Sequence, residues 1–288
     1  MKKIMVALIT PFFKKGCIDY KSLETIVLRL LGEGVDGFIV CGTTSEVSTL
    51  SHEERFQILN YVIKLCAHRC EIWFGCGSNN TQTTITLMKE AQNHEIDGYL
   101  IVTPYYNKPS QRGLFEHFSK IASHTKLPIM LYNVPARCGV TLSYEVIKAL
   151  KDKHPNIYGL KQASKDYDCV KKMKQAYPDF VIYSGEDAYL KQAFQAGMDG
   201  IISVAGHLFL ADIKAFIDAY ENHQDTAIAE ATMVKNAQLC FCDASPAPIK
   251  YMLSLRGECR NVLRLPLTVV SRDKQKLIDE FNRSFDIS

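Results

Sequence analysis

Lys161 is the residue of this sequence whose surroundings best suit covalent chemistry. It lies in the segment 156–164, NIYGLKQAS, where Ile157, Tyr158 and Leu160 predict a short buried strand that ends near the lysine. Burial disfavours the ammonium form and lowers the pKa of a lysine, and the resulting free amine can form a Schiff base with a carbonyl compound. A structural lysine whose ammonium group reaches water would also fit this segment alone.

Eight segments rich in β-forming residues alternate with amphipathic helical patterns along the chain. The predicted strands cover residues 4–10, 37–41, 71–76, 98–103, 128–133, 157–162, 180–184 and 200–204. They are continuously apolar, as expected for parallel strands that are covered on both faces. Helix starts are indicated by Asp19, by Ser51 with Glu54 three residues later, and by Ser110. This succession of units predicts a TIM (β/α)8 barrel.

Beyond residue 222 the pattern contains helices only, at 226–241, 246–255 and 272–285. We therefore expect a catalytic barrel domain over residues 1–224 and a C-terminal helical extension over residues 225–288. No predicted strand is followed by a GxGxxG loop that opens a helix, which disfavours a dinucleotide-binding sheet.

The composition is that of a globular protein, with 47% hydrophobic and 23% charged residues. A net charge of +3 with dispersed Lys and Arg does not indicate a nucleic acid or a membrane as the main partner. The apolar run before Pro11 is short and lacks a small-residue cleavage site, so it predicts a first strand rather than an export signal. We expect a cytoplasmic protein with reduced cysteines. Cys66, His68 and Cys70, and the pair Cys240 and Cys242, lack the paired spacing of a zinc site, so no metal is expected.

In a barrel, the groups that do chemistry lie where the strands end and in the loops that follow. Here those positions carry 42–46 (GTTSE), 104–107 (PYYN), 132–137 (YNVPAR), Lys161 and 184–187 (SGED). A lysine, two hydroxyl-rich loops and an arginine at one end of a barrel favour a catalytic role for Lys161.

Each group has a plausible task in lysine chemistry. Gly42 is expected to allow a tight turn in which Thr43 and Thr44 present donors to a small carboxylate. Tyr132 could relay protons to and from the carbon that the amine attacks. Arg137 offers a planar fork for a second carboxylate, although a surface arginine would fit the same position.

Tyr105 and Tyr106 are adjacent, so their side chains should point in different directions. One could serve the site while the other packs, and their spacing does not decide between them.

The motifs together resemble one known family. The sequences GTTSE at Gly42, YYN at Tyr105, YNVPAR at Tyr132, GLKQAS at Gly159, SGED at Ser184, ISVAGH at Ile202, SPAPIKYML at Ser245 and LRLPLT at Leu263 resemble those of the dihydrodipicolinate synthase / N-acetylneuraminate lyase family of class I aldolases, and in particular of its lysine-pathway branch. The resemblance covers essentially the whole chain.

This resemblance implies a role for each matching position. Lys161 would form a Schiff base with pyruvate, and Tyr132 would donate and accept protons. Thr43 and Tyr106 would complete a hydroxyl relay, with Tyr106 reaching in from a neighbouring subunit. The remaining implied substrate-binding positions are Thr44, Ile202 and Gly185 for pyruvate and the reacting centre, and Arg137 for the carboxylate of aspartate semialdehyde.

The resemblance further implies that no metal or organic cofactor is needed, that pyruvate and aspartate semialdehyde are the substrates, and that the protein is a homotetramer built as a dimer of dimers.

Two departures from the family pattern carry expectations of their own. Ser45 replaces a glycine, and a positive φ there would cost about 1 kcal/mol and shift the loop. The positions that match the binding site of the inhibitor lysine are Val47, Ser48, His52, Arg55, Asn79, Thr83 and Tyr105. Thr83 replaces a glutamate and Arg55 adds positive charge, so we expect weak or absent inhibition by lysine.

Two alternatives remain at this stage. A sister pyruvate aldolase, such as N-acetylneuraminate lyase or a keto-deoxy-sugar aldolase, would share Lys161 and Tyr132, but Arg137 favours a partner substrate with a carboxylate. A non-catalytic binding or regulatory barrel is disfavoured because Lys161, Tyr132, Thr43, Tyr106 and Arg137 are all present.

Overall fold

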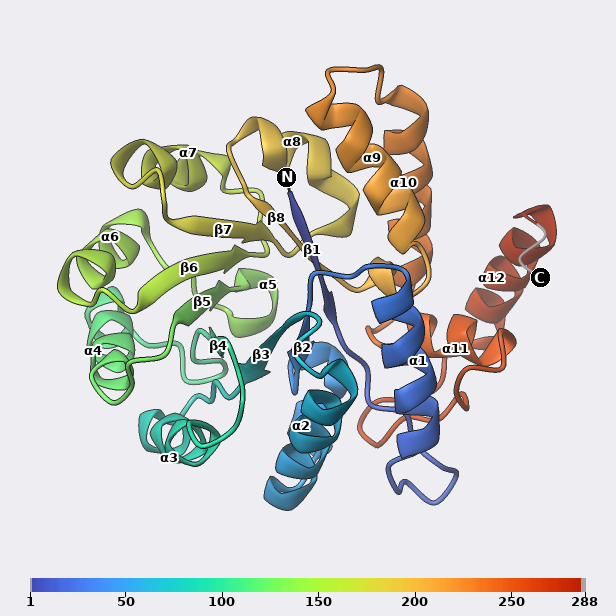
Figure 1. Cartoon of the computed structure of the whole chain (residues 1–288), viewed down its shortest axis with the longest axis horizontal. Coiled ribbons are helices and arrows are strands. Elements are labelled where there is room, and N and C mark those ends of the chain that lie inside the picture. The colour runs from blue at the N-terminus through green and yellow to red at the C-terminus, as the bar shows by residue number, and fades with distance from the viewer. Residues whose placement is uncertain (1, 286–288) are drawn as a thin grey trace.

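Eight parallel strands close into one barrel in the computed structural model, which describes residues 2–285 and the side chains up to residue 281 (Figure 1). The strands are β1 (Lys3–Ala7), β2 (Gly37–Val40), β3 (Glu71–Gly75), β4 (Gly98–Val102), β5 (Ile129–Asn133), β6 (Ile157–Gln162), β7 (Val181–Ser184) and β8 (Gly200–Ser203). Each strand pairs with the next, and β8 pairs with β1. The predicted TIM barrel is confirmed, with β6 at its predicted bounds.

Helices follow the strands around the barrel, and the three starts indicated by the sequence are confirmed. They are α1 (Tyr20–Gly32), α2 (His52–Cys66), α3 (Thr81–Ala91), α4 (Gln111–Ala122), the short α5 (Pro135–Cys138), α6 (Tyr144–Lys153), α7 (Tyr167–Ala176), α8 (Leu190–Gln195) and α9 (Leu210–Glu221). Asp19 caps α1, Ser51 and Glu54 form a capping box on α2, and Ser110 caps α4.

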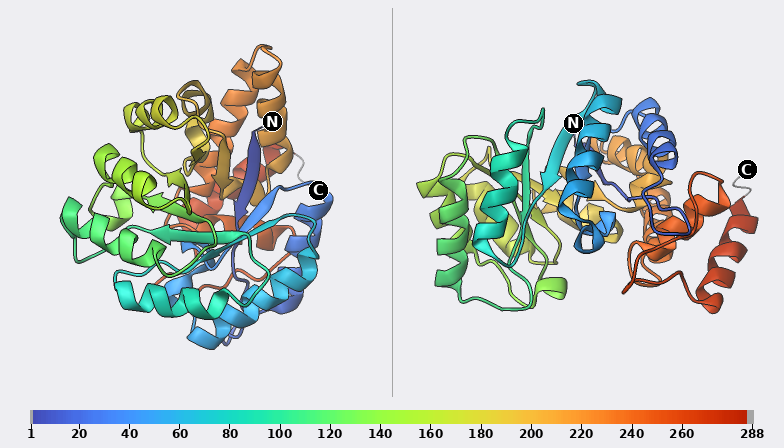
Figure 2. Two further views of the ribbon diagram at one scale, coloured as in Figure 1. Left: turned by 60° about the vertical axis from the view of Figure 1, so that its left-hand side comes forward. Right: turned by 90° about the horizontal axis from the view of Figure 1, so that it is seen from below.

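Three further helices form the C-terminal extension: α10 (Ala227–Cys240), α11 (Ala247–Leu255) and α12 (Arg272–Phe285). Figures 1 and 2 show α11 and α12 to one side of the barrel, next to α1. An ion pair between Arg29 of α1 and Glu258, at 2.8 Å, joins the two parts. The three predicted helices are thus present, and the domain boundary at residues 224 and 225 stays a prediction.

Alternating side chains of the strands build two separate apolar cores. Ile4 and Val6 of β1 point outward and pack against the helices, whereas Met5 and Ala7 point into the barrel. The inner core also contains Tyr132 and Ile202. Residues that face the barrel interior near the strand ends are therefore held in a packed environment.

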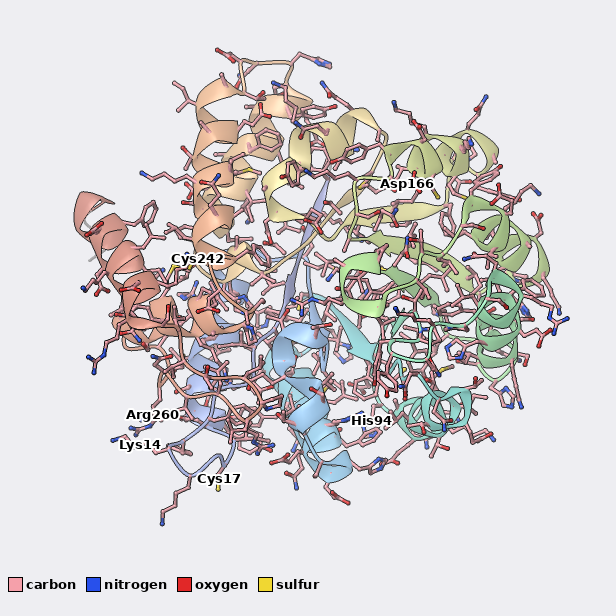
Figure 3. All side chains as sticks on the ribbon, turned by 180° about the vertical axis from the view of Figure 1, so that it is seen from behind. Lys14, Cys17, His94, Asp166, Cys242 and Arg260 are labelled. Atoms are coloured by element: carbon pink, nitrogen blue, oxygen red, sulfur yellow. The ribbon has the colours of Figure 1, made fainter. Side chains whose placement is uncertain are left out.

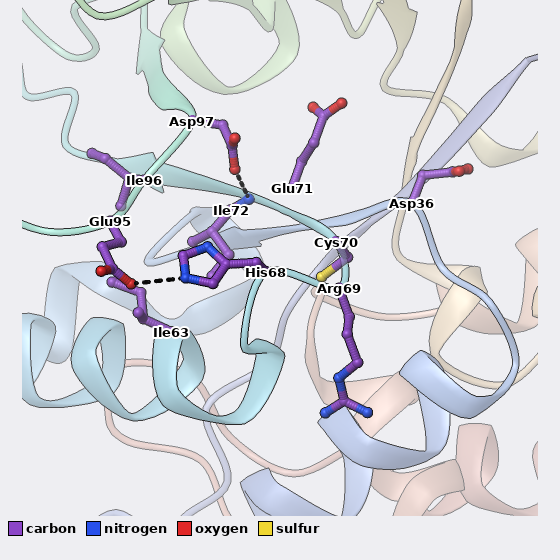
Figure 4. A pocket seen from close by; sticks show the side chains of 10 residues that line it. All are labelled: Asp36, Ile63, His68, Arg69, Cys70, Glu71, Ile72, Glu95, Ile96 and Asp97. Carbon is purple, nitrogen blue, oxygen red and sulfur yellow. Dashed lines mark hydrogen bonds and ion pairs between the residues drawn. The ribbon is translucent and has the colours of Figure 1, made fainter.

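The amino ends of the strands are fixed by a repeated Asp-Gly device. Asp36, Asp97 and Asp199 each precede a strand glycine and accept a hydrogen bond from a backbone N–H of a neighbouring strand. The distances are 2.7 Å from Ile4, 2.7 Å from Ile72 and 2.8 Å from Ile182, respectively. Figure 4 shows the bond from Ile72 to Asp97 beside a pocket at this end of the barrel. These carboxylates stabilise the barrel at the end opposite the candidate site.

All ten cysteines are free, and seven of them are buried. Figure 3 labels the exposed Cys17, on the loop before α1, and Cys242, after α10. Within residues 2–285, no group of three or more His, Cys, Asp or Glu side chains is arranged to hold a metal ion. No helix in this part of the chain has the length and apolar character needed to cross a membrane.

Candidate active site

A bulge in β6 decides the direction in which Lys161 points. Ile129 of β5 pairs with Ile157, but the next residue, Met130, pairs with Gly159, so Tyr158 is an extra residue in β6. The pairing then continues in register, and Tyr132 lies opposite Lys161. Since a shift of one residue exchanges the two faces of a strand, the bulge turns Lys161 into the barrel beside Tyr132.

The Lys161 side chain is only 6% exposed and lies against an aromatic ring. Its Nζ is 4.5 Å from the centroid of the Tyr132 ring. Burial lowers the pKa of Lys161 to about 8, although the carboxylate of Asp187 acts in the opposite direction. The amine is therefore available as a nucleophile near neutral pH.

Tyr132 is linked to the loop after β2. Burial raises the pKa of Tyr132 to about 12, while the positive charge of Arg137 and a hydrogen bond with the side chain of Thr43 oppose the rise. The phenol therefore keeps its proton at neutral pH and can donate it to a group bound next to Lys161.

Thr43, Tyr132 and Arg137 line one cavity of about 330 Å³. Arg55 lines the same cavity, and no Asp or Glu is among its lining residues in the described chain. A cavity with two arginines and no acidic group favours anionic ligands such as carboxylates. The predicted site residues Thr43, Tyr132, Arg137 and Lys161 are thus brought together at the carboxyl ends of the strands.

The other predicted residues on the barrel strands and loops lie close to this group. A Cβ atom on Gly185 would lie 3.0 Å from Cε of Lys161 and 2.7 Å from Cβ of Ala163, so the absence of a side chain leaves room for the lysine. Ile202 faces the barrel interior in the same inner core as Tyr132. Thr44 is buried in the short 3-10 helix η1 (Thr43–Ser45).

Tyr106 is the predicted site residue that the single chain does not bring to the cavity. Its side chain is 89% exposed, and its φ of 73° places it in the left-handed region. The neighbouring Tyr105 lines the cavity instead.

The tight turn expected at Gly42 is present, because the backbone N–H of Ser45 donates to the backbone oxygen of Gly42 at 3.1 Å. Gly42 itself has backbone angles that any residue can adopt, φ −79° and ψ −172°. Ser45 does not have a positive φ. The left-handed residues are Cys41, with φ 59°, and Glu46, with φ 56°. Ser45 is accommodated without strain, and its hydroxyl donates to the backbone oxygen of Leu8 at 2.6 Å.

Asp187 belongs to the site, although sequence reasoning gave it no role. It is buried and accepts hydrogen bonds from the Ser203 hydroxyl and, at 3.1 Å, from the Val204 backbone N–H. Burial raises the pKa of Asp187, and the hydrogen bonds to its carboxylate oppose the rise. Its place in SGED directly after β7 was the signal that could have revealed it.

Comparisons with known proteins agree with this geometry. The profile of the Dihydrodipicolinate synthetase family matches residues 1–282. The chain is 39% identical to 4-hydroxy-tetrahydrodipicolinate synthase of Bacillus subtilis (strain 168) over 275 residues, which cover 94% of this chain and 95% of that protein.

Solved structures agree as well. The chain superposes on dihydrodipicolinate synthase from Aquifex aeolicus with a TM-score of 0.95 at 31% identity, covering 100% of this chain and 99% of the other. A monomeric dihydrodipicolinate synthase variant also matches, with a TM-score of 0.95 at 32% identity over 100% of this chain and 98% of the other.

Proposed function

The chain belongs to the dihydrodipicolinate synthetase family, and we propose that it catalyses the 4-hydroxy-tetrahydrodipicolinate synthase reaction, the condensation of pyruvate with L-aspartate-4-semialdehyde. The enzyme is a lyase of the class I aldolase type. The observation that carries the proposal is the buried amine of Lys161 beside the phenol of Tyr132. Burial lowers the pKa of Lys161 to about 8, so near neutral pH it supplies much more free amine than an ordinary lysine does.

In the proposed reaction, the amine of Lys161 adds to the keto carbon of pyruvate, and Tyr132 gives the proton that the oxygen needs to leave as water. Loss of a methyl proton from the resulting iminium ion gives an enamine. The enamine carbon forms a bond with the aldehyde carbon of aspartate semialdehyde, the aldehyde oxygen takes up a proton and becomes a hydroxyl group, and the iminium ion is formed again. The amino group of the product then attacks the iminium carbon, closes the ring and releases Lys161.

The substrate carboxylates are assigned to different parts of the site. The start of η1, with Thr43 and Thr44, is proposed to hold the carboxylate of pyruvate, together with the backbone near Ile202. Arg137, on α5 at the mouth of the cavity, is proposed to hold the carboxylate of aspartate semialdehyde. This second anionic group, and the synthase names of the relatives, favour aspartate semialdehyde over a sugar as the partner substrate.

The relay is proposed to be completed by Tyr106 of a neighbouring copy, since Tyr106 projects from the surface of its own chain. This requires at least a dimer, and the family resemblance supports a homotetramer. No cofactor takes part in the proposed steps. A cytoplasmic location suits free cysteines of which most are buried.

Borohydride trapping tests the proposal. The protein is incubated with pyruvate, reduced, digested and examined by mass spectrometry, and we expect an adduct on the peptide that carries Lys161. Lys161→Ala, which should fold normally, is the matched control and should show neither adduct nor turnover. An adduct at another lysine, or none on folded wild-type protein, would overturn the mechanism. Supplying aspartate semialdehyde in parallel with N-acetylmannosamine then identifies the partner substrate.

A further inference from the structure

The loop that carries Thr43 and Thr44 is fastened to the C-terminal extension by a buried ion pair. Glu46 follows η1 directly, and Lys250 lies in α11. Their side chains are both 0% exposed, and Nζ of Lys250 donates to Oε1 of Glu46 across a sequence separation of 204 residues. A buried charge is retained at such a place only with a well-placed partner, so the two residues depend on each other.

The extension also occupies the second oxygen of the same carboxylate. The backbone N–H of Arg264 donates to Oε2 of Glu46 at 2.9 Å. Lys250 in turn donates to the backbone oxygen of Val262 at 2.9 Å. The cationic groups of Lys250 and Arg264 lie 4.2 and 4.4 Å from the ring centroid of Phe12, in the segment after β1. Both carboxylate oxygens of Glu46 therefore accept hydrogen bonds from the C-terminal extension.

The Arg264 guanidinium fixes the far end of the loop. Its Nη1 donates to the backbone oxygen of Thr49 at 2.8 Å and to the carboxylate of Glu54 in α2 at 2.7 Å. Its Nε donates to the backbone oxygen of Gly16 at 2.9 Å. Together with the two bonds of Nη2, to Gly16 and Glu54, all five N–H groups of the side chain have acceptors. The segment between Glu46 and Thr49 is therefore tied to the extension at both ends.

This attachment acts directly behind the active-site threonines. Glu46 has a left-handed backbone, which is unfavourable for a residue with a side chain and persists where the surroundings hold it. Its N–H donates to the backbone oxygen of Thr43 at 3.1 Å, which closes the η1 turn. A change in the position of Glu46 is thus transmitted to Thr43, the hydrogen-bond partner of Tyr132.

We propose that Glu46 and Lys250 are positioning residues of the active site, through which the C-terminal extension sets Thr43 opposite Tyr132 and Thr44 at the pyruvate subsite. This proposal rests on the proposed function. It assigns the extension a part in catalysis that a simple packing role does not require. Arg137 lies on α5 and has no contact with this network among the hydrogen bonds and ion pairs of the described residues, so the two substrates should be affected unequally.

The decisive experiment compares Lys250→Met with a control that also weakens the attachment of the extension. The control is Glu258→Gln, because Glu258 pairs with Arg29 of α1 and has no bond to the GTTSE loop. We expect Lys250→Met to lower kcat and to raise KM for pyruvate, each by about tenfold, with KM for aspartate semialdehyde within about twofold of wild type. Glu258→Gln should leave all three constants within about twofold.

A second readout is hydrogen exchange of the backbone amides of residues 42–49, which should be faster in Lys250→Met than in Glu258→Gln. If Lys250→Met does not fold, the double variant Glu46→Gln/Lys250→Met, which removes both charges, takes its place with the same expected result. Unchanged pyruvate kinetics, equal changes for both substrates, or failure of both variants to fold would overturn the positioning role. Absence of a pyruvate adduct on wild-type protein would instead overturn the proposed function, and the exchange measurement would still test the attachment.

Discussion

The pKa of Lys161 predicts the pH dependence of the reaction. Burial lowers this pKa from 10.5 to about 8, and the reactive form is the deprotonated amine. We therefore expect kcat/KM for pyruvate to fall about tenfold per pH unit below pH 8 and to level off above it. Initial rates between pH 6 and pH 10, in buffers of constant ionic strength, measure this pH dependence of kcat/KM. A rate that continues to climb up to about pH 10 would mean that the lysine has its ordinary pKa.

Gly185 provides the second prediction for a single residue. Ala at this position places Cβ 2.7 Å from Cβ of Ala163 and 3.0 Å from Cε of Lys161, and the backbone there has an ordinary φ, so the effect is steric and falls on both Ala163 and the lysine side chain. We expect Gly185→Ala to lower kcat by about 10- to 100-fold, because a displaced nucleophile loses its alignment. A matched control is Gly32→Ala at the end of α1, where no atom lies within 4 Å of the new Cβ. Similar kinetics for the two variants would contradict the packing argument.

At the scale of the elements, the aspartates that precede the strand glycines allow a test that separates stability from catalysis. Asp36→Ala removes the acceptor of the Ile4 N–H, at the end of the barrel opposite the site. We expect a loss of about 1–2 kcal/mol in the free energy of unfolding and a kcat within about twofold of wild type. Asp36→Asn, which keeps an acceptor oxygen, should lose less, and the exposed Asp179→Ala should lose at most about 0.5 kcal/mol. Urea unfolding measures the loss, and a large fall in kcat for Asp36→Ala would refute the division of roles between the two ends.

The elements were largely predictable because buried parallel strands are continuously apolar and because caps such as Ser51 with Glu54 are local signals. The direction of Lys161 was not predictable in this way. Strict alternation from the outward-facing Ile157 would place Lys161 outside the barrel, and only the bulge at Tyr158 reverses this. The motif identified the lysine, but its orientation depends on pairing with β5, which a single segment does not encode.

Contacts between segments that are distant in the sequence could not be predicted either. Glu46 and Lys250 each lay in a recognised motif, yet nothing local indicates that they meet, because 204 residues separate them. The same holds for the conformation of the GTTSE loop. The turn predicted at Gly42 is present, but nothing local indicates that Cys41 and Glu46 are left-handed or that the extension holds Glu46.

At the scale of the whole molecule, the cavity argues against regulation by lysine. The positions that match the lysine site and line this cavity are Val47, Ser48, Arg55, Thr83 and Tyr105. None of the described lining residues is acidic, so neither ammonium group of a bound lysine would have a carboxylate to pair with. We expect less than half inhibition by sub-millimolar lysine in initial-rate assays. The double variant Arg55→His/Thr83→Glu supplies an acidic partner and removes a cation, so it should become more sensitive. Strong inhibition of the wild type would show that another group binds the ammonium.

The exposed Tyr106 predicts that activity depends on the association of two chains. A dihydrodipicolinate synthase variant described as monomeric shares this fold. Catalysis needs a partner chain if the phenol of Tyr106 completes the relay to Thr43 and Tyr132 in a neighbouring copy. Specific activity should then fall on dilution in parallel with the dimer fraction measured by sedimentation velocity.

Tyr106→Phe should lower kcat by about 10-fold or more at concentrations where it remains associated, because it removes only the hydroxyl. A mixture of Tyr106→Phe and Lys161→Ala should be more active than the two variants measured separately and added, because a mixed dimer has one site with an intact lysine and an intact partner tyrosine. If the mixture is no more active than that sum although mass spectrometry detects the mixed dimer, Tyr106 acts within its own chain or not at all.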